Sequence, residues 1–266
     1  MNPSVLDSLL NLDYDDISVQ IRNFISTYVE EAGANGAVLG LSGGVDSTVT
    51  AQLAAKALSS KKMMGLILPD HTTTPREDVE DAENTAKQLG IKTQSIDINL
   101  IHNTFMKNLR QGRIPEGNLR ARIRMCLLYY YANLDNRIVI GTGDRSEILI
   151  GYYTKYGDGG VDILPIGGLY KTQVRALAKH LNISSRIVEK QSSPRLWAGQ
   201  TAEDEIGQKY EVIDPALHLL FDLNLSPERT EKQLGNPEII NQVLEMNRRS
   251  QHKRETPQIC KIQQPT

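Results

Sequence analysis

The residues best suited to chemistry form the run Gly40-Leu41-Ser42-Gly43-Gly44-Val45-Asp46-Ser47. The apolar residues Ala37-Val38-Leu39 precede this glycine loop, and a helix-like segment begins near Asp46. Adjacent glycines let the backbone approach a ligand, and the free N–H groups at a helix start favour an anion such as a phosphate. Ser42 and Ser47 add hydroxyl donors, whereas the carboxylate of Asp46 repels phosphate unless a cation lies between them. The run therefore predicts a site for a metal-bound polyphosphate.

The glycine loop matches neither the Walker A pattern Gly-x-x-x-x-Gly-Lys-Ser/Thr nor the dinucleotide pattern Gly-x-Gly-x-x-Gly. A tight turn with an Asp/Ser helix cap is the purely structural alternative. Residues 42–47 follow a predicted strand, however, and together they resemble the pyrophosphate loop Ser-Gly-Gly-x-Asp-Ser of the N-type ATP pyrophosphatases. Those enzymes split ATP between its α and β phosphates to form an adenylate. The resemblance implies this reaction type and an adenine nucleotide alpha hydrolase-like fold.

Short β-rich runs alternate with longer amphipathic runs, which predicts an α/β fold with helices on both faces of a parallel sheet. We expect a doubly wound sheet of five strands, at 37–41, 63–68, 93–98, 137–142 and 161–166. The intervening helices are expected at 46–57, 75–89, 118–132 and 171–181. A helical C-terminal extension follows from Tyr210, and no linker divides the chain, so residues 1–266 are expected to form a single domain.

A second polar motif, Gly141-Thr142-Gly143-Asp144-Arg145-Ser146-Glu147, stands at the end of the predicted fourth strand. If the first and fourth strands are neighbours, ligands bind beyond their carboxyl ends. Asp46 and Glu147 would then face one cleft, where two carboxylates can hold the Mg²⁺ that accompanies ATP. By itself Glu147 would be an ordinary solvated helix residue; the glycine loop makes it a candidate metal ligand.

Residues 190–207 interrupt the alternating pattern with serines, a proline and the acidic group Glu203-Asp204-Glu205. A long polar loop inside a compact domain is more often functional than idle. We therefore interpret residues 190–207 as a lid.

Composition excludes several classes of protein. The 266-residue chain is 39% apolar with a net charge of −2, so it can build a core but lacks the bulk positive charge that nucleic-acid binding needs. No apolar run approaches the ~20 residues of a membrane span, and the acidic N-terminus is unlike a targeting peptide. Cys126 and Cys260 are far apart and form no CxxC motif, which favours a reducing, cytoplasmic setting.

Several motifs together resemble the NAD synthetase family, in particular its ammonia-dependent members. The similarity covers nearly the whole chain in the same order, through Gly117-Asn118-x-x-Ala121-Arg122-x-Arg124-Met125, the segment 154–162, Gly167-Gly168-Leu169-Tyr170-Lys171 and His252-Lys253-Arg254. The resemblance implies that ATP is held by Gly40 to Ser47, Thr142, Lys171 and Ser193, with Asp46 and Lys171 as catalytic residues. It further implies magnesium on Asp46 and Glu147, and deamido-NAD on Arg122, Lys155, Asp162, His252 and Lys253.

Two physical points bear on these roles. Lys171 is a movable cation suited to the charge that develops on phosphate, and an arginine can grip a phosphate with two donors. Arg120 and Arg124 lie four apart on one helical face with Arg122 roughly opposite, so the three cannot reach one ligand. The chain also departs from the family pattern at Asp144, where Asn or His is expected, and at Ser193, where threonine is common.

The implied reaction amidates deamido-NAD with ammonia, consuming ATP and releasing AMP, pyrophosphate and NAD through an acyl adenylate. The first predicted strand begins by about Ala37, leaving no room upstream for a glutamine-hydrolysing domain, so free ammonia is the expected nitrogen donor. The family implies a homodimer. The alternatives are another N-type ATP pyrophosphatase that amidates or thiolates a different substrate, or an ATP-binding sensor without chemistry. A sensor would need neither Glu147 nor Lys171, and sulfur-transfer enzymes usually use paired or catalytic cysteines, which this chain lacks.

Overall fold

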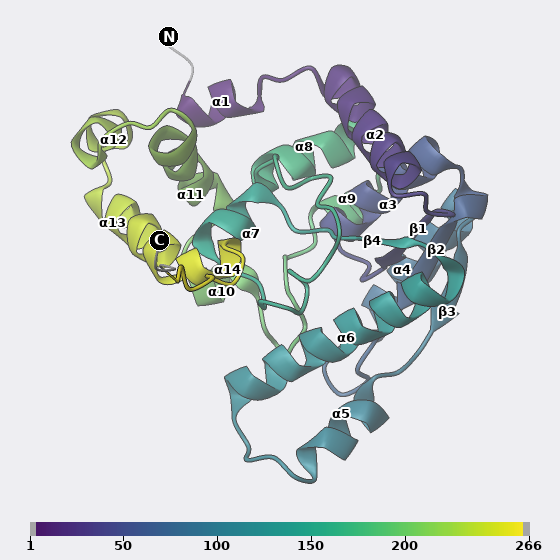
Figure 1. Cartoon of the computed structure of the whole chain (residues 1–266). Coiled ribbons are helices and arrows are strands. Elements are labelled where there is room, and N and C mark those ends of the chain that lie inside the picture. Colours follow the sequence, from purple (N-terminus) through teal and green to yellow (C-terminus); the bar gives the residue numbers. More distant parts are fainter. Residues whose placement is uncertain (1–3, 263–266) are drawn as a thin grey trace.

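The computed structural model describes residues 4–262, and its centre is a parallel sheet of four strands in the order β3-β2-β1-β4. The strands are β1 (Ala37–Gly40), β2 (Met63–Ile67), β3 (Lys92–Ser95) and β4 (Ile138–Ile140). Leu39 in the middle of the sheet pairs with Gly65 of β2 on one side and with Ile140 of β4 on the other. The parallel α/β sheet is confirmed, and β1 and β4 are neighbours (Figure 1).

The prediction of a fifth strand at 161–166 is wrong. This segment runs beside β4 but makes only an isolated bridge between Ile140 and Ile163. Pro165 has no N–H to donate to a ladder. The chain then turns, with the N–H of Gly167 bonded to the carbonyl of Leu164 at 3.0 Å. The apolar pattern therefore reflects burial beside the sheet without continuous pairing.

Both faces of the sheet are covered at β1, β2 and β4, which explains why these strands are nearly continuously apolar, whereas the edge strand β3 is polar and exposed. Leu39 and Ile140 point into one core, whereas Val38 and Val139, one residue earlier, point into the other. The first core is completed by α2 (Tyr14–Glu31), α3 (Val45–Leu58), α4 (Arg76–Leu89), α8 (Lys171–His180) and α9 (Ser185–Val188). The second is completed by α5 (Asn99–Met106) and α6 (Arg113–Asp135). A single 3₁₀ turn (Ser60–Lys62) leads into β2.

A third layer consists of helices alone and contains the end of the chain (Figure 1). It includes α1 (Val5–Leu10), α7 (Arg145–Ile150), α10 (Ala202–Ile206), α11 (Tyr210–Leu217), a π-helical turn (His218–Asp222), α12 (Pro227–Leu234), α13 (Pro237–Arg249) and α14 (Gln251–Arg254). Leu9, Tyr210, Ile213 and Val243 meet in the core of this helical layer. Helix α11 also contacts α8, so the helical layer packs directly behind one of the helices that cover the sheet.

The helix boundaries differ from expectation mainly in α6, which begins at Arg113 instead of Asn118. Pro115 lies within its first turn, where a missing N–H leaves no helical bond unmade. Residues 190–207 are not loop throughout, because α10 forms at their end. None of the helices in residues 4–262 combines the length and apolar character that crossing a membrane requires.

Candidate active site

The glycine loop lies between the end of β1 and the start of α3. Gly43 has φ of 75°, and a Cβ on it would lie 2.2 Å from the carbonyl oxygen of Asp78, so only glycine fits there. Gly44 caps α3 without any side-chain hydrogen bond, which leaves amide groups of the first helical turn available to a ligand. The Ser42 and Ser47 hydroxyls lie 3.0 Å apart and close the loop. This geometry suits the anion cradle that the sequence predicts, and phosphate binding there stays a prediction.

Lys171, the first residue of α8, connects the two predicted motifs. Its Nζ lies 2.7 Å from Asp46 Oδ2, 2.9 Å from Asp144 Oδ2 and 2.8 Å from Glu147 Oε1. The lysine side chain is fully buried, and so is Asp144. We call these four residues the lysine–carboxylate cluster. Asp46 and Glu147 therefore face one site, as the sequence predicts, and Asp144 joins them.

The electrostatics of the lysine–carboxylate cluster are those of a site with excess negative charge. Burial is the largest cause that raises the pKa of Glu147 to about 8; the neighbouring Asp144 and Asp46 act in the same direction, and Lys171 acts against them. Burial likewise raises the pKa of Asp144. For Lys171 burial favours the neutral amine, but the three carboxylates prevail and raise its pKa well above the ordinary value. One ammonium among three carboxylates leaves room for a further cation.

The same cluster offers ligand atoms that suit a divalent cation. Asp46 Oδ1 is buried and accepts no hydrogen bond. A buried carboxylate oxygen without a partner is costly, and coordination of a hard cation such as Mg²⁺ would satisfy it. Asp46 at the glycine loop and Glu147 across the cleft would hold the ion between the protein and a phosphate. The donor set fits the predicted metal site.

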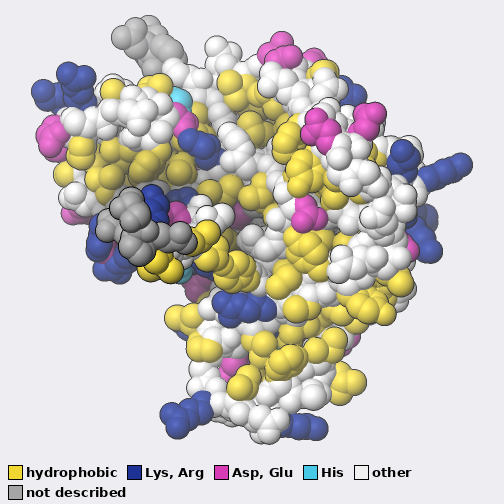
Figure 2. Space-filling view, viewed as in Figure 1, with side chains coloured by type: hydrophobic (Ala, Val, Ile, Leu, Met, Phe, Trp, Pro, Cys, Tyr) yellow, Lys and Arg dark blue, Asp and Glu magenta, His cyan; other side chains and the backbone are white. Residues whose placement is uncertain are grey.

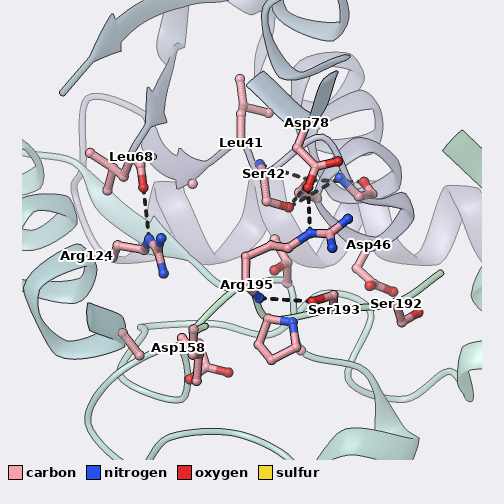
Figure 3. A pocket seen from close by; sticks show the side chains of 18 of the residues that line it. Leu41, Ser42, Asp46, Leu68, Asp78, Arg124, Asp158, Ser192, Ser193 and Arg195 are labelled. Atoms are coloured by element: carbon pink, nitrogen blue, oxygen red, sulfur yellow. Dashed lines mark hydrogen bonds and ion pairs between the residues drawn. The ribbon is translucent and has the colours of Figure 1, made fainter. Parts of the chain in front are cut away.

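A cavity of about 270 Å³ opens over the glycine loop. Its lining includes most of the residues predicted to bind ATP: Gly40, Leu41, Ser42, Gly44, Val45, Asp46, Ser47, Thr142 and Ser193. Glu147 lines it as well, and Lys171 lies behind it in the lysine–carboxylate cluster. Figure 3 shows side chains from several separate segments converging on this cavity. The cavity therefore gathers residues that lie far apart in the sequence.

The residues predicted to bind deamido-NAD lie outside this cavity. Arg122 is exposed on α6 and donates to the carbonyl of Lys155 at 3.3 Å. Lys155 in turn donates to the carbonyl of His252, so these three residues form one surface group. Lys253 donates to the carbonyls of Gly151 and Tyr153, at 2.6 Å each.

Asp162 has structural contacts within the chain. It accepts hydrogen bonds from the Tyr129 hydroxyl at 2.9 Å and from the Val139 amide at 2.7 Å. The second bond fastens Asp162 to β4. A role of Asp162 in binding deamido-NAD stays a prediction.

Of the arginines on α6, only Arg124 lines the cavity. Its Nε donates to the carbonyl of Leu68 at 2.9 Å, and Figure 3 shows its guanidinium directed inward. Arg120 is instead paired with the buried Asp70 at 2.7 Å. The expectation that these arginines cannot share a ligand is confirmed. The helical repeat gave the right geometry but did not tell which face meets the cavity.

Sequence reasoning also missed the contacts that hold the start of the lid. Lys190 donates to the carbonyl of Gly43 at 3.0 Å and pairs with Asp78 at 2.9 Å and with Asp81. Arg195 pairs with Asp78 at 2.7 Å (Figure 3). Asp78 and Asp81 lie three apart on α4, a spacing that places both on one face; no partner was evident from sequence. The start of this segment thus rests directly against the glycine loop, and its action as a lid stays a prediction.

Comparison with known proteins agrees with this geometry. The NAD synthase family model matches residues 17–257. The NH(3)-dependent NAD(+) synthetase of Hyperthermus butylicus is 53% identical over 255 residues, covering 95% of this chain and 92% of the relative.

Solved structures extend the agreement to three dimensions. The NMN synthetase of Francisella tularensis has a TM-score of 0.82 at 35% identity, covering 95% of this chain and 100% of its own. The NH3-dependent NAD synthetase of Campylobacter jejuni has a TM-score of 0.81 at 32% identity, covering 94% and 100%. This chain belongs to the NAD synthase family.

Proposed function

We propose that this ligase forms NAD from deamido-NAD, ATP and ammonia, in two steps. The nicotinate carboxylate attacks the α-phosphorus of ATP, which releases pyrophosphate, and ammonia then attacks the acyl adenylate, which releases AMP and NAD. The observation that carries the proposal is the convergence of the glycine loop with the lysine–carboxylate cluster beside one cavity, in a chain of the NAD synthase family.

Each part of the site has a task in the first step. The loop amides and the hydroxyls of Ser42 and Ser47 bind the departing pyrophosphate. A magnesium ion held by Asp46 and Glu147 would neutralise charge on the phosphates. The Lys171 ammonium lies within 3 Å of both carboxylates and stabilises the charge that develops during adenylation. No covalent enzyme intermediate is required, because positioning and charge account for the catalysis.

We further propose that the dinucleotide extends from the cavity toward the surface group of Arg122, Lys155 and His252, together with Asp162 and Lys253. Lys155 and Lys253 lie over the rings of Tyr156 and Tyr153, so cations and aromatic surface occur together there. Arg122 is exposed on α6, where a second copy of the chain could complete the site. A homodimer in the cytoplasm is the assembly we propose; both cysteines are free, which suits a reducing compartment.

A product assay tests the reaction. The purified chain is incubated with ATP, magnesium, ammonium and deamido-NAD whose nicotinate carboxylate carries oxygen-18. We expect NAD, AMP and pyrophosphate in equal amounts, with one labelled oxygen in the AMP, because the attacking carboxylate oxygen stays on phosphorus. Pyrophosphate without NAD would favour a different acceptor substrate, and no pyrophosphate would favour the sensor.

Two further arms define the substrates. Glutamine replaces ammonium in one, and NAD formation there would refute free ammonia as the direct donor. The mononucleotide counterpart of deamido-NAD replaces the dinucleotide in the other, because a structure named NMN synthetase superposes as well as the NAD synthetase does. A higher kcat/KM for the mononucleotide would transfer the assignment to that substrate.

A further inference from the structure

The interior of the helical layer holds one more buried carboxyl group, close to the lysine–carboxylate cluster but not part of it. Asp214 of α11 is fully buried and does not line the cavity. It accepts a hydrogen bond from the Ser146 hydroxyl at 2.7 Å and another from the Thr172 amide at 3.0 Å. Its two oxygens thus bind the first turns of α7 and α8, the helices that carry Glu147 and Lys171.

These bonds reach both residues through their immediate neighbours. Ser146 precedes Glu147 in the chain, and the Ser146 hydroxyl oxygen accepts a hydrogen bond from the backbone amide of Lys171 at 2.9 Å. The amides of Lys171 and Thr172 belong to the start of α8, where helical N–H groups have no helical acceptor and the dipole favours negative charge. Asp214 therefore fixes where α8 begins relative to α7.

The same helix also restrains the other end of the Lys171 side chain. Tyr210, one turn before Asp214 on α11, is fully buried, and its ring centroid lies 5.5 Å from Lys171 Nζ. A cation over an aromatic face is attracted to it. Helix α11 thus lies against the Lys171 ammonium through Tyr210, and Asp214 reaches the Lys171 backbone amide indirectly, through the Ser146 hydroxyl of α7.

We propose that Asp214 is a positioning residue for the amidation reaction: it aligns Lys171 and Glu147 by binding the first turns of the two helices that carry them. The proposal rests on the proposed function, because it acts through the catalytic role of Lys171. Its effect belongs to the turnover step, since a displaced Lys171 ammonium would bind ATP but meet the developing charge poorly.

The variant Asp214→Asn is suited to the test. Asparagine can accept from Thr172 with its oxygen and donate to the Ser146 oxygen with its amide, but Ser146 then loses its own acceptor. Burial raises the pKa of Asp214 to about 7 in spite of its hydrogen bonds to Ser146 and Thr172, so its ionisation at pH 8 costs folding stability and a neutral replacement should fold. Ser146→Ala is the second variant, because it removes the connecting hydroxyl and little volume.

Gln173→Ala is the matched control. Gln173 is buried in the same first turn of α8 and makes two hydrogen bonds of 2.9 Å, from the Tyr170 amide and to the Leu9 carbonyl, but none to Ser146 or Lys171. Its loss should lower the melting temperature and leave kcat near the wild-type value at a temperature where the protein is folded. This control separates lost packing from lost alignment.

The decisive measurement is a double-mutant cycle with Lys171→Ala. We expect Asp214→Asn to lower kcat by roughly tenfold to a hundredfold while KM for ATP changes less than about threefold, and Ser146→Ala to have a smaller effect in the same direction. In the Lys171→Ala background both losses should shrink to about threefold or less, because no ammonium is left to align and only the placement of Glu147 still matters. Equal losses in both backgrounds, or wild-type kcat in Asp214→Asn, would overturn the proposal. If the wild type itself forms no NAD, the proposed function fails instead.

Discussion

At the scale of single residues, Lys171 has a more complex role than its sequence motif indicates. The motif presents it as a phosphate ligand, whereas the structure places its ammonium among the carboxylates of Asp46, Asp144 and Glu147. Burial first, and then the repulsion between the carboxylates, raises the pKa values of Asp144 and Glu147 in spite of the single cation. The charges that suit this cluster to catalysis therefore lower the stability of the folded protein. Substitutions in the cluster should change turnover and melting temperature separately.

The first prediction concerns Glu147→Gln. The folded-state pKa of Glu147, about 8, lies above the ordinary value of 4.5, so its ionisation costs stability progressively as pH rises between those values. Glutamine does not ionise. In a metal-free buffer we therefore expect the melting temperature of the variant, relative to wild type, to increase from pH 5 to pH 8. Turnover should fall by roughly a hundredfold or more, because a metal ligand is lost. Asp46→Asn should lose turnover likewise.

Glu211→Gln serves as the control for this pH series. The Glu211 side chain is 46% exposed and pairs with Arg175 and with no residue of the cluster, so its removal should leave the pH trend of the melting temperature unchanged. A pH-independent difference for Glu147→Gln, or magnesium-dependent activity at the wild-type level, would contradict the assignment of Glu147.

The second prediction concerns Lys171→Ala. We expect kcat to fall by roughly a hundredfold or more, the usual scale for a lost transition-state charge partner. The three carboxylates would then lack their cation, so the melting temperature should fall in chelator and recover with Mg²⁺ by more than the wild type gains. Thermal unfolding with and without Mg²⁺ measures this. A rise in KM for deamido-NAD alone would assign Lys171 to the other substrate.

At the scale of secondary-structure elements, the lid is held to α4 and α6 by distinct contacts. Lys190 and Arg195 pair with Asp78 of α4. Trp197 lies against Gly117 of α6, where an added Cβ would come within 3.1 Å of its ring, and the guanidinium of Arg113 lies 5.0 Å from the ring centroid. The one tryptophan of the chain therefore reports on the position of the lid.

The third prediction concerns Asp78→Asn, which weakens the pairs with Lys190 and Arg195. We expect faster proteolysis within residues 190–207 and a changed emission spectrum of Trp197, both reversed in part by ATP plus deamido-NAD. Limited proteolysis with mass spectrometry and tryptophan fluorescence measure the two effects. Glu80→Gln on the same helix removes a surface pair with Arg76 and should behave as wild type. Equal cleavage rates in Asp78→Asn and wild type would argue that the pairs of Asp78 with Lys190 and Arg195 do not hold this segment.

At the scale of the whole molecule, α6 carries an exposed stripe that a second copy of the chain would cover. Arg122, Cys126 and Tyr130 lie four residues apart and are all exposed, and Tyr130 is 63% exposed in spite of its size. Figure 2 shows hydrophobic side chains gathered along the α6 side of the molecule. An apolar stripe beside a proposed dinucleotide residue is consistent with a homodimer that shares this helix.

The fourth prediction follows from that stripe. We expect sedimentation equilibrium to give twice the chain mass of 29.7 kDa, and Tyr130→Glu to give a single chain. The variant should have a higher KM for deamido-NAD with little change for ATP, because Arg122 lies on the same stripe whereas the glycine loop does not. Leu223→Glu, at a site that is 53% exposed in the helical layer, is the control and should remain a dimer. A dimeric Tyr130→Glu variant would show that the interface lies elsewhere.

That residues 1–266 form a single domain stays a prediction.

The sequence by itself determined the features that local patterns encode. Short stretches of sequence encode the glycine loop, the acidic residues after β1 and β4, and the alternation of strands and helices. They can do so because backbone conformation and periodic burial depend on residues that are near neighbours in the chain. The same patterns led to the correct family, and most of the residues that they predict to bind ATP line the cavity. They also led to a fifth strand, because apolar periodicity reports burial and cannot report whether a strand finds a pairing partner.

Only the tertiary structure decided which side chains meet. Asp46 and Lys171 are 125 positions apart, and Ser146 and Asp214 are 68 apart, yet each pair lies 2.7 Å apart. Likewise it was the packing of α6 against the sheet that turned Arg124 toward the cavity and left Arg122 at the surface. The physical reason is that such contacts depend on the rotation and approach of whole helices, which the summed packing of the cores fixes and no local stretch of sequence encodes.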